Sequence, residues 1–261
     1  MTDDLRLLID AAHASGDIAR KHFGASPEVW DKDGNAGPVT EADLEIDTML
    51  RTDLLAARAT YGWLSEETED DAARLSHDRV FIVDPIDGTR AFIAGERHFA
   101  HSLAIAEGGR VTTAVVYLPM MDLLFAATET DTATLNGEPI TTSSPQGLEG
   151  ATVLATKPNM RPEHWIGEVP PVKRKFRPSL AYRLCLVAQG RYDAMLTLRD
   201  CWEWDIAAGD LIVRQAGGRV TDRHDHPLVF NNPLPKTKGC HAAGVSLHCA
   251  LQSRIRQQDP Q

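Results

Sequence analysis

The stretch Val83-Asp84-Pro85-Ile86-Asp87-Gly88-Thr89-Arg90 decides the expected fold, because it joins a strand, a tight turn and a helix start within eight residues. The apolar run up to Val83 is typical of a buried strand. Asp84 and Asp87 follow with only a proline and an isoleucine between them, so a tight turn can bring both carboxylates to one point. Gly88 allows another group to approach the backbone closely. The stretch therefore predicts an α/β protein that presents two carboxylates at the end of a strand.

A short helix is expected from Thr89 to about Ala94, directly after the two carboxylates. The free N–H groups and positive dipole end of a helix start suit a phosphate. Carboxylates repel an anion unless cations lie between them, since two like charges about 4 Å apart cost about 1 kcal/mol in water and about 4 kcal/mol at an effective dielectric constant of 20. Hard oxygen ligands beside an anion site therefore suggest Mg²⁺. From the residues alone, a calcium-type turn or an Asx-turn before a helix stays an equal alternative.

Two further acidic stretches and one isolated aspartate are candidates for the same site. The first stretch is VTEADLEID at residues 39–47, in which Thr40 is the expected N-cap of a helix over residues 41–58. The second is WLSEETEDD at residues 63–71, whose last three acids are expected to be a solvated face. Asp205 follows two tryptophans and precedes a helix of small residues, which suits a carboxylate held at a partly buried helix start. Aspartate is also common as a simple N-cap.

The remaining chain mixes helices and strands without an internal repeat. An amphipathic helix is expected over the first 23 residues, and an antiparallel meander over residues 101–127. The later expected elements are helices at residues 179–189 and 206–216 and strands at residues 192–198 and 219–221. The pattern predicts α/β or α+β layers, with an N-terminal lobe over residues 1–150 and a C-terminal lobe over residues 151–261.

The composition excludes several classes of protein. The chain has 261 residues, a formal net charge of −10, 43% hydrophobic residues and 25% charged residues, which is typical of a soluble globular protein. An acidic balance disfavours binding to nucleic-acid polymers or anionic membranes. No run approaches the roughly 20 apolar residues that a membrane span needs, so no membrane insertion is expected. Four scattered cysteines without a CxxC pair, and a first segment unlike a secretory signal, predict a reduced, cytoplasmic protein.

We interpret one basic run and two cysteine–histidine pairs as structural features rather than as functional sites. Lys173-Arg174-Lys175 is interpreted as a solvated edge strand and not as a binding patch. The pairs Cys240-His241 and His248-Cys249 are interpreted as ordinary tail residues, because structural zinc sites have tighter pairing.

Four segments occur in one order along nearly the whole chain: VTEADLEID, WLSEET, VDPIDGTRAF and WDIAAGDLIVRQAGGRVTD. In this combination the sequence resembles the inositol monophosphatase-like family of Mg²⁺-dependent, lithium-sensitive phosphomonoesterases. VDPIDGT with a later WDIAAG is the most specific part of the match. The resemblance implies a layered αβαβα sandwich of the inositol monophosphatase and fructose-1,6-bisphosphatase type. It also implies a homodimer that acts on a small phosphorylated metabolite.

The resemblance implies two or three Mg²⁺ ions in each active site. Glu66, Asp84 and the backbone carbonyl of Ile86 match the ligands of the first ion. Asp84, Asp87 and Asp205 match those of the second, so Asp84 would bridge the two. Asp87 and Asp205 are also expected to contact the substrate. Glu66 would in addition help to orient the attacking water and remove its proton.

The resemblance further implies which residues hold the phosphate and assist the water. The backbone N–H groups of Gly88 and Thr89 would bind the phosphate. Thr89 and Asp43 match a threonine–aspartate pair beside the attacking water. Glu67 would support the metal-binding glutamate before it, and Lys32 is a weaker match to a lysine near the site.

The C-terminal segment RPSLAYRLCLVAQG, residues 177–190, indicates the substrate class. It resembles bacterial 3′(2′),5′-bisphosphate nucleotidases, which often read SSLKFCLVAEG here. Arg183 stands in place of that lysine and is a candidate contact to a second phosphate, the alternative being a helix-surface arginine in an ion pair. Animal inositol monophosphatases carry an acid seven residues before the aspartate of WD, where this chain has Leu198.

The expected reaction is therefore the hydrolysis of 3′-phosphoadenosine 5′-phosphate to AMP. Three alternatives stay open: an inositol-1-monophosphatase or broad sugar phosphatase, a histidinol phosphatase, and a catalytically silent metal-binding member of the family. The histidinol phosphatase is included because DGTRAFIAG, residues 87–95, also resembles those enzymes.

Overall fold

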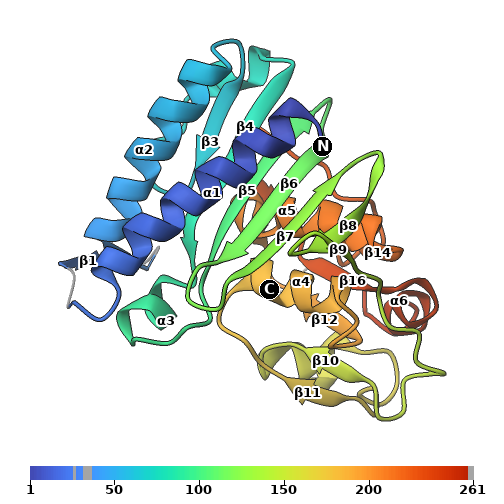
Figure 1. The fold of residues 1–261 in the computed structure, drawn as a ribbon. Helices are drawn as coiled ribbons and strands as arrows, with labels where there is room; N and C mark the ends of the chain where they lie inside the picture. The colour runs from blue at the N-terminus through green and yellow to red at the C-terminus, as the bar shows by residue number, and fades with distance from the viewer. Residues whose placement is uncertain (26–27, 32–36, 258–261) are drawn as a thin grey trace.

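The structure is a computed structural model, and it describes residues 1–25, 28–31 and 37–257. Helices and sheets alternate through the molecule in layers (Figure 1). The α-helices are α1 (Asp3–His22), α2 (Glu41–Ala57), α3 (Thr89–Ile93), α4 (Leu180–Ala188), α5 (Glu203–Gln215) and α6 (Val245–Gln252). The short 3₁₀ helices among the described residues are η2 (Ala72–Ser76), η3 (Pro158–Met160) and η4 (Pro162–His164). No helix among the described residues is long and apolar enough to cross a membrane.

A seven-stranded sheet with the order β3-β4-β5-β6-β7-β8-β9 carries most of the first half of the chain. Strands β3 and β4 are parallel, and every later pair in this sheet is antiparallel. The expected meander is confirmed as β5, β6 and β7. The strands are β3 (Gly62–Ser65), β4 (Arg79–Asp87), β5 (Ala100–Glu107), β6 (Arg110–Leu118), β7 (Leu123–Thr128), β8 (Asp131–Leu135) and β9 (Glu138–Pro139).

A five-stranded sheet with the order β11-β10-β12-β16-β14 carries the second half. Its strands are β10 (Thr152–Leu154), β11 (Lys173–Lys175), β12 (Ala194–Thr197), β14 (Gly218–Thr221) and β16 (Cys240–Gly244). Two small ribbons pair β1 (Val29–Asp31) with β2 (Pro38–Thr40) and β13 (Cys201–Trp202) with β15 (Lys236–Thr237). The basic run forms β11 at the edge of this sheet, so the expected solvated edge strand is confirmed.

The layers stack in the order αβαβα (Figure 1). Helices α1 and α2 cover one face of the seven-stranded sheet, and α4 and α5 lie between its other face and the five-stranded sheet. Helix α6 packs on β14 and β16 beyond the second sheet. The expected fold is thus confirmed. The division into lobes at residue 150 stays a prediction, because α4 and α5 share one hydrophobic core with both sheets.

The sequence periods explain why these layers form. Alternate residues of β4 face opposite sides: Phe81 and Val83 pack against α1 and α2, whereas Val80 and Ile82 face the core around α4 and α5. Helix α2 begins at a capping box, in which the Thr40 hydroxyl accepts from a backbone N–H three residues on and that residue's carboxylate accepts in return. The expected N-cap at Thr40 is therefore confirmed.

Helix α5 begins earlier than the sequence predicts. It starts at Glu203 rather than at residue 206, and Trp202 is its N-cap. Asp205 therefore lies within the first turn and is not the cap. The reason is non-local, since the Glu203 N–H donates to the Pro235 carbonyl and its carboxylate accepts from the loop at residues 231–232.

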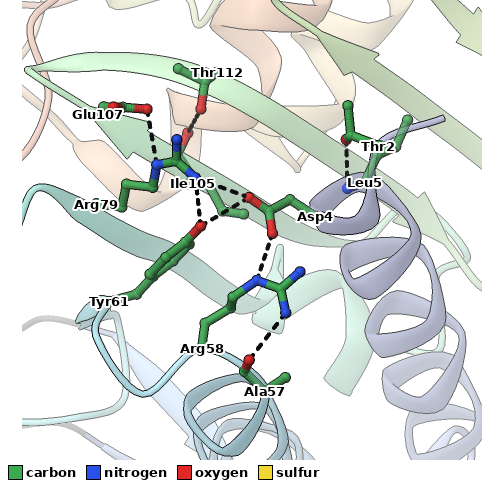
Figure 2. A network of polar contacts seen from close by, with 10 residues as sticks. All are labelled: Thr2, Asp4, Leu5, Ala57, Arg58, Tyr61, Arg79, Ile105, Glu107 and Thr112. Atoms are coloured by element: carbon green, nitrogen blue, oxygen red, sulfur yellow. Dashed lines mark hydrogen bonds and ion pairs between the residues drawn. The ribbon is translucent and has the colours of Figure 1, made fainter.

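A polar network ties the N-terminus of α1 to α2 and β4 (Figure 2). The Asp4 carboxylate accepts from Arg58 Nε at 2.7 Å and from the Tyr61 hydroxyl at 3.0 Å. Arg79 donates to the Tyr61 hydroxyl at 2.8 Å and pairs with Glu107 at 2.9 Å. These side chains are partly exposed, so each pair is worth little alone and the network is worth more.

We expect Asp4→Asn to lower the free energy of unfolding by about 1 kcal/mol, because it removes the charge that pairs with Arg58. Urea denaturation measures the loss, which should shrink at high salt because these charges are screened. Asp3→Asn is the matched control: Asp3 lies in the same first turn and is exposed. Equal losses in both variants would assign the effect to the helix dipole and contradict the role of the network.

Two histidines are stacked in the interior between β16 and α6. The rings of His241 and His248 lie 4.1 Å apart, nearly parallel at 11°. Burial lowers the pKa of His241 to about 4, and burial together with the neighbouring His241 ring lowers the pKa of His248 to about 2. Cys249 beside them is exposed, and no zinc-type group of three ligands forms here among the described residues. The structural interpretation of these tail residues stays a prediction.

The histidine pair makes stability depend on pH. In the unfolded chain both rings take up protons near pH 6.5, whereas the folded rings stay neutral to about pH 4. Stability is therefore complete above about pH 6.5 and falls as the pH decreases from there to about 4, by up to about 1.4 kcal/mol per pH unit for each ring. Buried His101, whose pKa burial also lowers to about 4, acts over the same pH range, so we expect His248→Gln to reduce the total slope by about a third in urea denaturation. The exposed His226→Gln should follow the wild type, and an unchanged slope in His248→Gln would contradict the assignment.

Candidate active site

A cavity of about 850 Å³ opens where β4 ends. It is lined by segments from both halves of the chain, including the start of α3, the loop before α4 and the first turn of α5. All the predicted metal ligands and both predicted phosphate-binding residues line it: Glu66, Asp84, Ile86, Asp87, Gly88, Thr89 and Asp205.

The strand that delivers the two aspartates does not end at Asp84 as expected. It continues to Asp87 through a bulge: these residues are three apart on β4, whereas their partners on β5 are two apart. Pro85 between them has no N–H to pair. Its carbonyl instead accepts from Nδ1 of buried His101 at 2.5 Å. The bulge therefore turns Asp84 and Asp87 toward the cavity while the strand continues.

Three carboxylates from separate segments converge in the cavity. Ligand atoms of Glu66, Asp84 and Asp205 all lie within 4.8 Å of one another. Both oxygens of Asp84 are buried, and no hydrogen-bond donor among the described residues reaches them. Burial, then the charge of Glu66, raises the pKa of Asp84 well above its ordinary value, and burial with the charge of Asp87 does the same for Asp205. Mg²⁺ prefers oxygen ligands, and these carboxylate oxygens lie together without a positive charge to balance them. They therefore fit a Mg²⁺ site.

Asp87 lies beside this group and connects it to α4. Its Oδ2 atom accepts from the Ser179 hydroxyl and from the Ala181 N–H, both at 2.6 Å. Burial raises the pKa of Asp87 to about 6, although these two hydrogen bonds act to lower it. Asp87 does not belong to the group of three carboxylates, so its place as a metal ligand stays a prediction.

The predicted threonine–aspartate pair is brought together at the start of α3. The Thr89 hydroxyl lies 3.4 Å from Asp43 Oδ1 and 3.1 Å from the Ile86 carbonyl. Asp43 is fully buried, and its other oxygen accepts from the N–H and hydroxyl of Thr40 at 2.8 Å and 2.5 Å. Gly88 caps α3 with φ of 104°, a left-handed conformation that a side chain would strain.

Asp47 is a site residue whose role the sequence did not reveal. Its two oxygens accept from the hydroxyls of Ser65 and Thr68, each at 2.5 Å, and these residues flank Glu66. Asp47 lies one helical turn after Asp43, so both point to the same side of α2. That spacing is the signal from which its role as a support of the Glu66 loop could have been inferred.

Two weaker sequence predictions concern the neighbourhood of Glu66. Glu67 does not line the cavity; it is half-buried, and its N–H donates to the Ser65 hydroxyl at 3.4 Å. Its supporting role stays a prediction. Lys32 lies outside the described residues.

Arg183 does not line the cavity. Its Nε donates to the Arg177 carbonyl at 2.5 Å, and its guanidinium lies 4.6 Å from the centre of the Phe176 ring. Burial lowers its pKa to about 10. The direct contact to a substrate phosphate thus stays a prediction, and the geometry supports better the arginines that do line the cavity: Arg90, Arg177 and Arg199. Arg199 directly follows Leu198, the position at which animal inositol monophosphatases carry an acid.

Comparisons with known proteins agree with this geometry. The model of the inositol monophosphatase family matches residues 2–258. An inositol-1-monophosphatase of Rhizobium meliloti (strain 1021) is 34% identical over 229 residues, which are 84% of this chain and 85% of that protein. The Nus factor SuhB of Escherichia coli (strain K12) is 32% identical over 240 residues, 87% of this chain and 89% of that one.

Solved structures extend the match to the whole fold. The extragenic suppressor protein suhB from Bartonella henselae superimposes with a TM-score of 0.83 at 28% identity, covering 97% of this chain and 98% of that one. An IMPase from Thermotoga maritima gives 0.81 at 29% identity, covering 97% and 96%. The layered fold and the carboxylate-lined cavity are those of a phosphatase. The chain belongs to the inositol monophosphatase family.

Proposed function

We propose that the protein is a Mg²⁺-dependent phosphomonoesterase that hydrolyses a small phosphorylated metabolite by attack of a water molecule. The observation that carries this proposal is the convergence of Glu66, Asp84 and Asp205, with both oxygens of Asp84 buried and without a donor. Buried carboxylates are stable only when they are paired or coordinate a metal. The wide cavity beside them leaves room for a phosphate ester.

The proposed ligands of a first ion are Glu66, Asp84 and the Ile86 carbonyl, and those of a second ion are Asp84, Asp87 and Asp205. When bound, Mg²⁺ supplies Lewis-acid chemistry: it lowers the pKa of a bound water and stabilises negative charge on phosphate oxygens. The chain supplies the negative charge that balances the cation. It also fixes the direction of the aspartates, because Asp84 and Asp87 lie on the bulged strand β4 and Asp205 lies in the first turn of α5.

The start of α3 binds the phosphate in the proposed reaction, and Thr89 and the buried Asp43 take up the proton of the attacking water. The backbone N–H groups of Gly88 and Thr89 bind the phosphate and orient it for in-line attack. The Thr89 hydroxyl receives a proton from the attacking water and donates its own to Asp43, which is 3.4 Å away. Asp43 is held for this purpose by two hydrogen bonds from Thr40.

We propose that the substrate carries a second anionic group, with 3′-phosphoadenosine 5′-phosphate as the expected example and AMP as its product. The support is that three arginines, Arg90, Arg177 and Arg199, line the cavity together with the carboxylates. A single phosphate bound at the metal site does not need three additional cationic side chains, so the arginines favour a substrate with a second anionic group. Arginine suits a second phosphate because its planar fork can donate two parallel hydrogen bonds.

Inositol 1-phosphate is the second candidate substrate, because the Rhizobium meliloti relative is named an inositol-1-monophosphatase. Against it stands Leu198, which is buried, does not line the cavity and offers no carboxylate to a polyol ring.

Phosphate release from three substrates tests both proposals: 3′-phosphoadenosine 5′-phosphate, inositol 1-phosphate and histidinol phosphate, each with Mg²⁺, EDTA, Ca²⁺ or Li⁺ added. We expect dependence on Mg²⁺, inhibition by Ca²⁺ and Li⁺, and the highest kcat/KM for the bisphosphate. Arg177→Gln should raise KM for the bisphosphate about tenfold and leave that for inositol 1-phosphate unchanged. A strong preference for inositol 1-phosphate would overturn the substrate choice, and no release from any substrate would favour a silent, metal-binding protein.

We also propose that the protein is a cytoplasmic homodimer. The support for the dimer is the family resemblance, and the support for a reducing compartment is that all four cysteines, three of them buried, are free thiols. Sedimentation velocity tests the dimer, with an expected mass twice the 28.6 kDa of one chain.

A further inference from the structure

Arg74 and Glu203 are two buried residues of opposite charge that no step of the proposed reaction uses. Arg74 lies in η2, just after the loop that carries Glu66, and its residue is 2% exposed. Glu203 is the first residue of α5, two positions before Asp205, and is 0% exposed. Buried charges are retained only where hydrogen bonds and partners compensate their desolvation. The partners of these two residues meet in one loop.

Arg74 joins its own segment to the loop at residues 231–232. Its Nε and Nη2 atoms donate to the two oxygens of Asp70 at 2.6 Å and 2.9 Å, a two-pronged pair. Nη1 donates to Asn231 Oδ1 at 2.5 Å, and Nη2 also donates to the Asn232 carbonyl at 2.8 Å. All three guanidinium nitrogens are therefore in use.

Glu203 accepts hydrogen bonds from the same two residues, Asn231 and Asn232. Its Oε2 atom accepts from the Asn231 N–H at 2.6 Å, and Oε1 accepts from the Asn232 N–H at 3.0 Å and side-chain amide at 2.7 Å. Asn231 has φ of 60°, a left-handed conformation that asparagine tolerates better than most residues. We call Arg74, Asn231, Asn232 and Glu203 together the asparagine clamp.

The asparagine clamp connects the two segments that carry Glu66 and Asp205, which are far apart in the sequence. Their carboxylates lie close together with Asp84, so their like charges drive the segments apart. A connection that lies outside the cavity and has buried charged ends, Arg74 and Glu203, opposes this separation. Neither Arg74 nor Glu203 lines the cavity, so they act on the site through the backbone of their segments.

We propose that the asparagine clamp holds Glu66 and Asp205 at the separation that a divalent cation needs, so that Arg74 and Glu203 are positioning residues for metal binding. This inference rests on the proposed metal site. It predicts that loosening the clamp weakens Mg²⁺ binding more than it slows the reaction once Mg²⁺ is bound.

The test uses three full-length variants, Arg74→Lys, Glu203→Gln and Asn232→Ala, and measures Mg²⁺ binding by titration calorimetry without substrate. We expect the dissociation constant for Mg²⁺ to rise about tenfold or more, as it does when residues that orient metal ligands are changed. At saturating Mg²⁺, kcat should stay within about threefold of the wild type. Arg58→Lys is the matched control, an equally conservative change in the network of Figure 2. It should lower Tm and leave Mg²⁺ binding unchanged.

The outcomes separate the inference from the proposed function. If the wild type binds no Mg²⁺, the proposed metal site fails and the inference with it. If the wild type binds Mg²⁺ and the variants bind it equally well at a lower Tm, the clamp has a structural role only and the inference is overturned. If Arg74→Lys does not fold, Asn232→Ala decides, because it retains both buried charges and removes only the side-chain amide bonds of a half-exposed residue.

Discussion

Asp84→Asn is expected to lower kcat about 1,000-fold or more and, without metal, to stabilise the fold by about 1–2 kcal/mol. Both effects have one cause. The Asp84 carboxylate is buried, receives no hydrogen bond from the described residues and lies among Glu66, Asp87 and Asp205. Its charge is costly in the empty protein and is needed once a cation is bound. The amide retains the shape of the side chain and removes the charge.

Steady-state phosphate release and thermal unfolding in EDTA measure the two effects of this variant. Glu69→Gln is the matched control, because Glu69 is an exposed acid that does not line the cavity. It should change neither kcat nor Tm. Turnover near that of the wild type in Asp84→Asn would remove the central ligand from the proposed site, whatever the variant does to Tm.

Thr89→Val is expected to lower kcat about 100-fold with little change in the binding of Mg²⁺. Valine has the shape of threonine and retains the backbone N–H that is proposed to bind the phosphate. It removes only the hydroxyl, which lies 3.4 Å from Asp43 and 3.1 Å from the Ile86 carbonyl. The loss therefore reports on proton transfer through the pair and not on the fold or the metal.

Serine at the same position provides the control for the valine variant. Thr89→Ser restores the hydroxyl without the methyl group and should recover most of the lost kcat. Calorimetric titration with Mg²⁺ should give similar dissociation constants for all three proteins. If Thr89→Val retains more than about a third of the wild-type kcat, the hydroxyl takes no part in the chemical step.

Local patterns were sufficient to predict most of the fold. The apolar run up to Val83 and the polar Thr40 before a helical stretch are local signals, and both elements form, although the strand continues to Asp87 rather than ending at Asp84. The bulge after Asp84 could not be predicted, because it depends on His101 from the neighbouring strand. The early start of α5 at Glu203 depends in the same way on a loop about 28 residues later in the chain.

In the candidate site, too, some features could be predicted from the sequence, whereas those that depend on non-local contacts could not. The resemblance to the inositol monophosphatase family implied Glu66, Asp84 and Asp205 as metal ligands, and these residues do converge in one cavity. The supporting contacts were not visible in the sequence, since they join side chains from different segments. Asp47 belongs to the motif VTEADLEID, but its hydrogen bonds to Ser65 and Thr68, which flank Glu66, cannot be read from that motif. The position of Arg183 in the sequence predicts a contact to the substrate, whereas its guanidinium donates to backbone carbonyls of the loop before α4.

The asparagine clamp has a consequence for protein synthesis. Glu66 and Asp205 are 139 residues apart, and at about 5–20 residues per second the ribosome needs roughly 7–30 s to pass from one to the other. The loop at residues 231–232 emerges later still. During this interval the nascent chain already exposes the strand that carries Asp84, and it has neither the last carboxylate nor the clamp that positions it. Hydrolysis by this protein is therefore a property of the nearly finished chain, and a truncated product that ends before residue 231 is expected to be inactive.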